Sequence, residues 1–98
     1  MTELPERLQE LNERIGSWLE RPDYISYTDS MDACLELIAP KLQKLGCGWY
    51  IGQPKDNKLV SCHIHCRSLG KQFAGHNESA PTAFCLAVEK MLEMLEAK

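Results

Sequence analysis

The residues with the most potential for chemistry lie in one short stretch, Ser61 to Arg67, which reads SCHIHCR. Two cysteines and two histidines this close together could bind a metal ion, support redox or nucleophilic chemistry, or simply occupy a β-strand. Successive side chains of a strand point to opposite faces. If the stretch is a strand, the cysteines share an apolar face with Val60 and Ile64, and the histidines share a polar face with Ser61 and Arg67.

Strand geometry limits what these side chains can bind. Cys62 and Cys66 would be about 13 Å apart along a strand, too far to share a zinc ion or to form a disulfide with each other. His63 and His65 would be about 6.6 Å apart, which permits a metal ion, with His76 as the obvious third nitrogen ligand. No CxxC or HExxH pattern supports such a site. We therefore favour no metal and no cofactor, and interpret His63, His65 and Arg67 as a surface that could contact a partner.

The chain has five cysteines, an odd number, and its N-terminus is charged where a secretion signal would be apolar. This pattern predicts buried free thiols in a reducing cytoplasm rather than a disulfide framework. A buried thiol is a poor nucleophile, and the sequence contains no nucleophile elbow and no glycine-rich phosphate loop. We expect the protein not to be an enzyme.

The composition is that of one globular domain covering residues 1–98. The sequence has 44% hydrophobic and 26% charged residues, a net charge of −3 and a pI near 5.6. Proteins that bind phosphates usually carry a net positive charge, and this chain is acidic, so nucleic acid is not an expected partner. A local basic patch could still be present within the negative net charge. No apolar run approaches the length of a membrane span, so we expect no membrane partner.

Three segments have the apolar period of a helix. The first covers about residues 2–20, with Leu4, Leu8, Leu11, Ile15 and Trp18 as its stripe. The second follows the capping residues Thr28 to Ser30, buries Met31, Cys34, Leu35, Ile38, Leu42 and Leu45, and ends at Gly46. Pro40 predicts a kink at Ala39 or a separate turn after it. The third covers about residues 79–97.

Between the second and third helices the period changes from 3.6 to 2. We expect strands at 48–52, 59–67 and 72–77, with a turn at 54–57 that makes the first two a hairpin. The predicted fold class is α+β, a three-stranded antiparallel sheet packed by helices in the order α-α-β-β-β-α. An N-terminal helix thus precedes an α-β-β-β-α unit at about residues 29–97.

Two surfaces of the first helix suggest contacts. Its acidic stripe is either a solvated face or a docking surface for a basic partner, and consists of Glu6, Glu10, Glu13 and Glu20. Its apolar stripe must be covered, either by the second face of the sheet or by another subunit, so a homodimer through this helix is a further expectation.

The order α-β-β-β-α is similar to that of the double-stranded-RNA-binding domain. That family places lysines at the start of its last helix to contact phosphates, whereas this chain has no lysine between Ser79 and Lys90. The chain more closely resembles the small bacteriophage proteins grouped as the phage ABA sandwich domain. Four segments carry the resemblance, in the family's order: Leu11–Trp18 (LNERIGSW), Tyr27–Leu37 (YTDSMDACLEL), Gly48–Tyr50 (GWY) and Ala80–Ala87 (APTAFCLA).

The resemblance implies a phage origin and a fold, and it supplies no catalytic residues. A phage protein of this size is expected to be a non-enzymatic accessory protein that binds a host component in the host cytoplasm. The favoured hypothesis is a counter-defence inhibitor, such as an anti-CRISPR protein whose acidic surface docks on a Cas effector. The first alternative is a sponge that sequesters a host immune signalling nucleotide in a basic pocket such as Arg67 with Lys71. A further alternative is a double-stranded-RNA-binding-like module.

Overall fold

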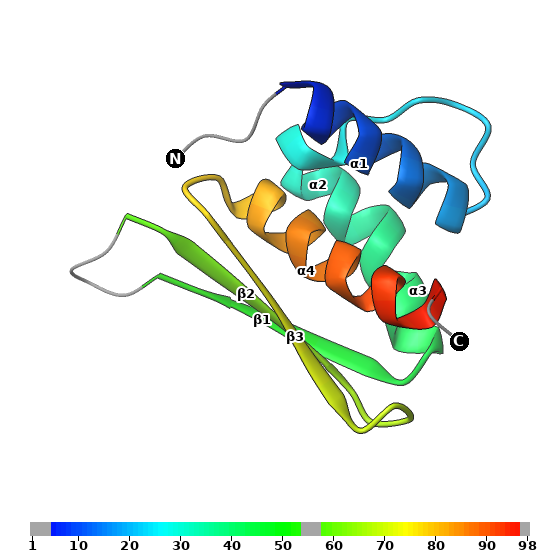
Figure 1. Ribbon diagram of the computed structural model, residues 1–98, viewed down its shortest axis with the longest axis vertical. Coiled ribbons are helices and arrows are strands. Elements are labelled where there is room, and N and C mark those ends of the chain that lie inside the picture. The colour runs from blue at the N-terminus through cyan, green and yellow to red at the C-terminus, as the bar shows by residue number, and fades with distance from the viewer. Residues whose placement is uncertain (1–4, 54–57, 97–98) are drawn as a thin grey trace.

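The computed structural model describes residues 5–53 and 58–96, and it has the predicted α+β architecture. A three-stranded antiparallel sheet is formed by β1 (Cys47–Gly52), β2 (Val60–Cys66) and β3 (Lys71–Asn77) in the order β1-β2-β3. The helices all lie on one side of this sheet (Figure 1). The predicted turn at 54–57 lies outside the described residues. No helix within the described ranges is both long and apolar enough to cross a membrane.

The side chains of β2 alternate as predicted. Val60, Cys62, Ile64 and Cys66 are buried beneath the helices, whereas Ser61, His63 and His65 point to the other face. The helix that covers this apolar face is α4 (Ala80–Glu96), whose buried residues include Phe84, Val88 and Met91. Burial of this apolar area provides the main stabilisation of the fold.

Gly75 lets α4 pack directly on β3. A Cβ atom at this position would lie 2.6 Å from the backbone nitrogen of Ala87 and 2.9 Å from the Cβ of Leu86, and it would also overlap the carbonyl oxygen of Ala83. The glycine that weakens the strand in the sequence pattern is therefore required by the close approach of helix and sheet.

The second helical region continues through Pro40. It begins with α2 (Met31–Ala33), where the Ser30 side chain accepts a hydrogen bond from the Ala33 amide as predicted for a capping residue. A π-turn, η2 (Cys34–Ile38), and α3 (Ala39–Lys44) follow without a break. The Ala39 amide donates to the Cys34 carbonyl five residues earlier, and this wide turn makes room for the proline ring.

The π-turn also changes which residues are buried. Cys34, Ile38 and Leu42 face the core as predicted, but Leu35 and Leu45 are exposed. The prediction for Leu35 was wrong because it assumed a regular α-helical period, which the wider turn interrupts. The prediction for Leu45 was wrong because this residue is the C-cap of α3, at the exposed end of the helix. Gly46 closes the region with a φ of 76°.

The first helix, α1 (Pro5–Trp18), lies on the helical layer and not on the second face of the sheet (Figure 1). Leu11 and Ile15 of its apolar stripe are buried within the chain. Asn12 joins α1 to the short helix η1 (Tyr27–Asp29), since its side chain donates to the Thr28 hydroxyl and accepts from the Thr28 amide. Leu4 lies outside the described residues. Leu8 and Trp18 are half-buried. A homodimer through α1 stays a prediction.

Candidate functional site

The face of the sheet opposite the helices is the first candidate site. Strand register arranges its outward residues in three rows: Gly52, Ser61 and His76; Tyr50, His63 and Ala74; and Gly48, His65 and Gln72. Each row is formed by residues that are directly opposite one another on neighbouring strands. All three histidines of the chain therefore lie on one uncovered surface.

Tyr50, on the edge strand β1, contacts two of the three histidines. Its ring stacks with His63 at 4.8 Å between centroids and an interplanar angle of 14°, and with His65 at 5.4 Å and 22°. Half of its surface remains exposed (50%). Tyr50 could not be identified from the sequence, because its position opposite His63 depends on the register of the hairpin.

Hydrogen bonds orient two of the imidazoles. Nδ1 of His76 lies 2.8 Å from the Ser61 hydroxyl, and Nδ1 of His63 accepts from the Gln72 amide nitrogen at 3.1 Å. The rings of His63 and His76 meet edge to face at 6.3 Å. Across residues 5–53 and 58–96, no three His, Cys, Asp or Glu side chains gather in an arrangement that could hold a metal ion.

A hollow of about 340 Å³ opens beside the stacked rings. It is lined by Tyr50, Gly52, Gln53, Ser61 and His63. Because Gly52 has no side chain and Ser61 has a small one, the backbone of β1 and β2 is accessible between taller groups. The hollow is thus wide and shallow, with an aromatic wall and polar neighbours.

Charge is distributed unequally between the sheet and the helices. Residues 47–77 contain four Lys or Arg residues and one Asp, a formal charge of +3, so the rest of the chain carries −6. The described parts of the segment, 47–53 and 58–77, contain no Asp or Glu. Lys58 precedes β2, whereas Arg67 and Lys71 flank the turn at its other end, and all three side chains are exposed.

The acidic stripe of the first helix is the second candidate surface. Glu6, Glu10 and Glu13 are exposed on α1, and Glu20 is exposed just beyond its end, where it has a φ of 59°. Among the described residues, no ion pair joins these four carboxylates to a cation.

The arginine side chains of α1 point away from the acidic stripe and toward α4. Arg7 binds Glu89 at 2.7 Å, and Arg14 binds Glu96 at 2.5 Å. Arg14 also lies 4.0 Å from Glu89, whose carboxylate is largely buried and therefore needs cationic partners. The pairing neutralises the inner side of α1 and leaves acidic groups on its outer side.

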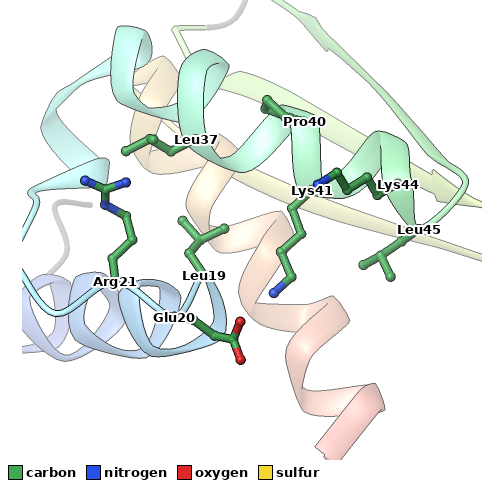
Figure 2. A pocket seen from close by; sticks show the side chains of 8 residues that line it. All are labelled: Leu19, Glu20, Arg21, Leu37, Pro40, Lys41, Lys44 and Leu45. Atoms are coloured by element: carbon green, nitrogen blue, oxygen red, sulfur yellow. The ribbon is translucent and has the colours of Figure 1, made fainter.

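A third surface is a groove of about 460 Å³ between the end of α1 and α3 (Figure 2). Its cations are Arg21, Lys41 and Lys44, and its apolar residues are Leu19, Leu37, Pro40 and Leu45, with Glu20 at the edge. Lys41 closes one side, since its Nζ donates to the Trp18 carbonyl at 2.5 Å and lies 5.0 Å from the centroid of the Trp18 ring. Arg67 and Lys71, the basic pair expected from the sequence, do not belong to this groove.

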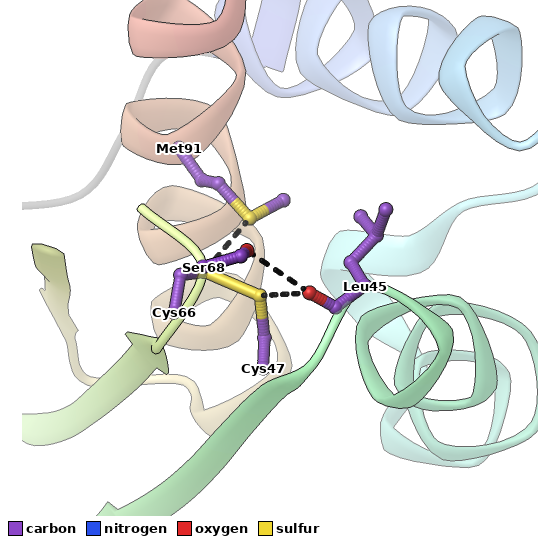
Figure 3. The surroundings of a disulfide bond; sticks show 5 residues. All are labelled: Leu45, Cys47, Cys66, Ser68 and Met91. Atoms are coloured by element: carbon purple, nitrogen blue, oxygen red, sulfur yellow. Dashed lines mark hydrogen bonds between the residues drawn. A yellow bond between two sulfur atoms is a disulfide. The ribbon is translucent and has the colours of Figure 1, made fainter. Parts of the chain in front are cut away.

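The cysteine prediction was wrong for two residues. Cys47 and Cys66 form a disulfide at the corner where α3 leads into β1, next to Leu45, Ser68 and Met91 (Figure 3). The register places them directly opposite each other, with 4.2 Å between their Cα atoms. Cys62 does not pair with Cys66, in agreement with the distance argument.

The other three cysteines are free and buried, as predicted. Burial, with a smaller contribution from Cys34, raises the pKa of Cys62 to about 12. The hydrogen bond with Cys34, whose Sγ lies 3.9 Å away, and then burial raise the pKa of Cys85 well above its ordinary value. Cys62 and Cys85 therefore stay protonated at neutral pH, which makes them poor nucleophiles.

Comparison with known proteins adds no relative from which a function could be transferred. No family model, curated protein or solved structure matches the chain.

Proposed function

We propose that the protein is a non-enzymatic accessory protein that docks on a host complex through the outer face of α1. The observation that carries this proposal is the sorting of charge on that helix. Arg7 and Arg14 are paired with α4, whereas Glu6, Glu10 and Glu13 point to solvent. Such a surface suits a partner that presents a row of lysines or arginines.

A basic channel that binds nucleic acid is a partner of this kind. Together with the resemblance to small phage proteins, this favours a counter-defence role in the host cytoplasm, in which the acidic face occupies the channel of a Cas effector. Steering by exposed charge raises the association rate and weakens as salt screens it. The proposal thus predicts a strong dependence of binding on ionic strength.

Charge reversal tests this role. Replacing Glu6, Glu10, Glu13 and Glu20 with lysine should abolish copurification of the effector and inhibition of its DNA cleavage, since attraction becomes repulsion. The control variant reverses Asp32, Glu36, Glu78 and Glu93, which are also exposed but lie elsewhere. Retention of both activities by the first variant would exclude docking through α1.

The groove between α1 and α3 favours a second candidate, a sponge for a host signalling nucleotide. Its cations Arg21, Lys41 and Lys44 could attract phosphates, while its leucines and Pro40 offer apolar contact to a base. A thermal-shift screen with cyclic dinucleotides should raise the melting temperature of the wild type and not of a Lys44→Glu variant. Absence of a shift across the panel would eliminate this candidate.

A double-stranded-RNA-binding-like role has less support. The element order agrees, but α4 begins at Ala80 and its first lysine is Lys90. The phosphate contacts of that family would therefore lack their cations.

A further inference from the structure

We propose that the outer face of the sheet binds single-stranded nucleic acid. This inference goes beyond docking through α1 and rests on different residues, those of the three outward rows of β1, β2 and β3. Three observations carry it: the sorting of charge between the layers, the stacked rings, and the hollow beside them.

The charge of the sheet layer suits a polyanion. The net charge of −3 is an average over a sheet segment at +3 and a remainder at −6. On the described sheet, exposed cations stand at both ends of β2, Lys58 at one and Arg67 with Lys71 at the other. A strand of seven residues is about 23 Å long. Lys71 pairs with the inward-facing Cys66, so it stands at the edge of the sheet and not on the outer face itself. A chain of phosphates crossing the face would therefore meet the cations at its two ends.

The rings between these cations suit unstacked bases. Tyr50 and His63 form the wall of the hollow, and Ser61 and Gly52 form its low floor, so a planar base can enter and lie against an imidazole or phenol. Stacking of bases on aromatic side chains contributes about 1–3 kcal/mol per base and tolerates any sequence. The amide nitrogens of Gln53 and Gln72 donate to Lys58 and His63, and Nδ1 of His76 is bonded to Ser61. The amide oxygens of the two glutamines and Nε2 of His76 are the atoms that offer hydrogen bonds to base edges.

Other occupants fit this face less well. A duplex keeps its bases stacked on one another, so the rings would have nothing to bind. An apolar protein surface would bury little aliphatic area here, because Ala74 is the one aliphatic side chain among the nine outward positions. A free nucleotide would use the hollow but not the separated cations.

Fluorescence anisotropy with a labelled single strand of about 12 nucleotides tests the proposal. We expect binding that weakens between about 50 and 200 mM salt. We also expect the unlabelled single strand to compete far better than a duplex of the same length or a mononucleotide. Tyr50→Ala and His63→Ala should each reduce affinity by about fivefold or more through lost stacking. Tyr50→Phe, which keeps the ring, should bind nearly as well as the wild type and so separates stacking from misfolding.

Matched controls use the helical side of the molecule. Tyr24→Ala removes another exposed tyrosine, and Lys90→Ala removes an exposed cation of α4, so neither should change the affinity. Lys58→Ala and Arg67→Ala should each lower the dependence of binding on salt. Failure of the single strand to bind at low salt, equal competition by duplex or mononucleotide, or full binding by Tyr50→Ala would each overturn the proposal.

Discussion

Gly75 illustrates how one absent side chain sets the distance between helix and sheet. Its neighbours across the interface are backbone atoms of Ala83 and Ala87, which cannot rotate away from an added methyl group. We expect Gly75→Ala to lower the free energy of unfolding by about 2–3 kcal/mol, at the upper end of overpacking in cores. Urea unfolding followed by circular dichroism measures this value.

Gly48→Ala is the matched control for that prediction. It adds the same methyl group to β1, the opposite edge strand of the sheet, but nothing lies within 4 Å of the new atom. The change in stability should stay within about 0.5–1 kcal/mol. Equal effects of the two substitutions would mean that α4 does not approach β3 at Gly75.

At the scale of elements, the helices and strands could be predicted where a period was unbroken. Alternation along residues 60–66 correctly placed the cysteine side chains inward and the imidazoles outward, and Ser30 was recognised as a cap. A regular period could not foresee the π-turn, because the extra residue in that turn is a response to Pro40 and the surrounding packing. Leu35 was consequently assigned to the wrong side.

Strand register limited prediction of the candidate site. The pairing of Cys47 with Cys66, and of Tyr50 with His63, depends on how the hairpin turn is formed, and turn residues alone do not define it. A shift of register would separate both pairs. The histidines could therefore be assigned to one face, but neither their stacking with Tyr50 nor the disulfide could be anticipated.

At the scale of the whole molecule, net charge conceals how unequally the charges are divided between the two layers. Sequence-averaged acidity argued against nucleic acid, yet the fold separates a basic sheet layer from an acidic helical layer. The outer faces of α1 and of the sheet are therefore chemically different, and we propose different partners for them. The net charge of a protein predicts its interactions with charged partners only when positive and negative residues are evenly distributed over its surface.

The buried ionisable groups of the core predict how the whole fold responds to alkaline pH. Burial raises the pKa of Cys62 to about 12 from 9.0, and the pKa values of Cys85 and Tyr27 are also raised. Between pH 9 and about pH 12, the Cys62 thiol of the unfolded chain loses its proton, whereas that of the folded chain keeps it. The folded state is therefore fully stable with respect to this ionisation below about pH 9, and its free energy of unfolding falls as pH rises toward 12. Urea midpoints measured from pH 7 to 11 should fall steadily above pH 9.

Removing one of these thiols should make the fall less steep. Cys62→Ala eliminates its titration, so its urea midpoint should change less with pH than that of the wild type, although its stability at pH 7 is lower. Val88→Ala also truncates a buried side chain of the core but removes no ionisable group, so its slope should equal that of the wild type. If the Cys62→Ala slope matched the other two, the buried thiol would not be linked to alkaline unfolding, and its desolvation in the core would be far weaker than the structure requires.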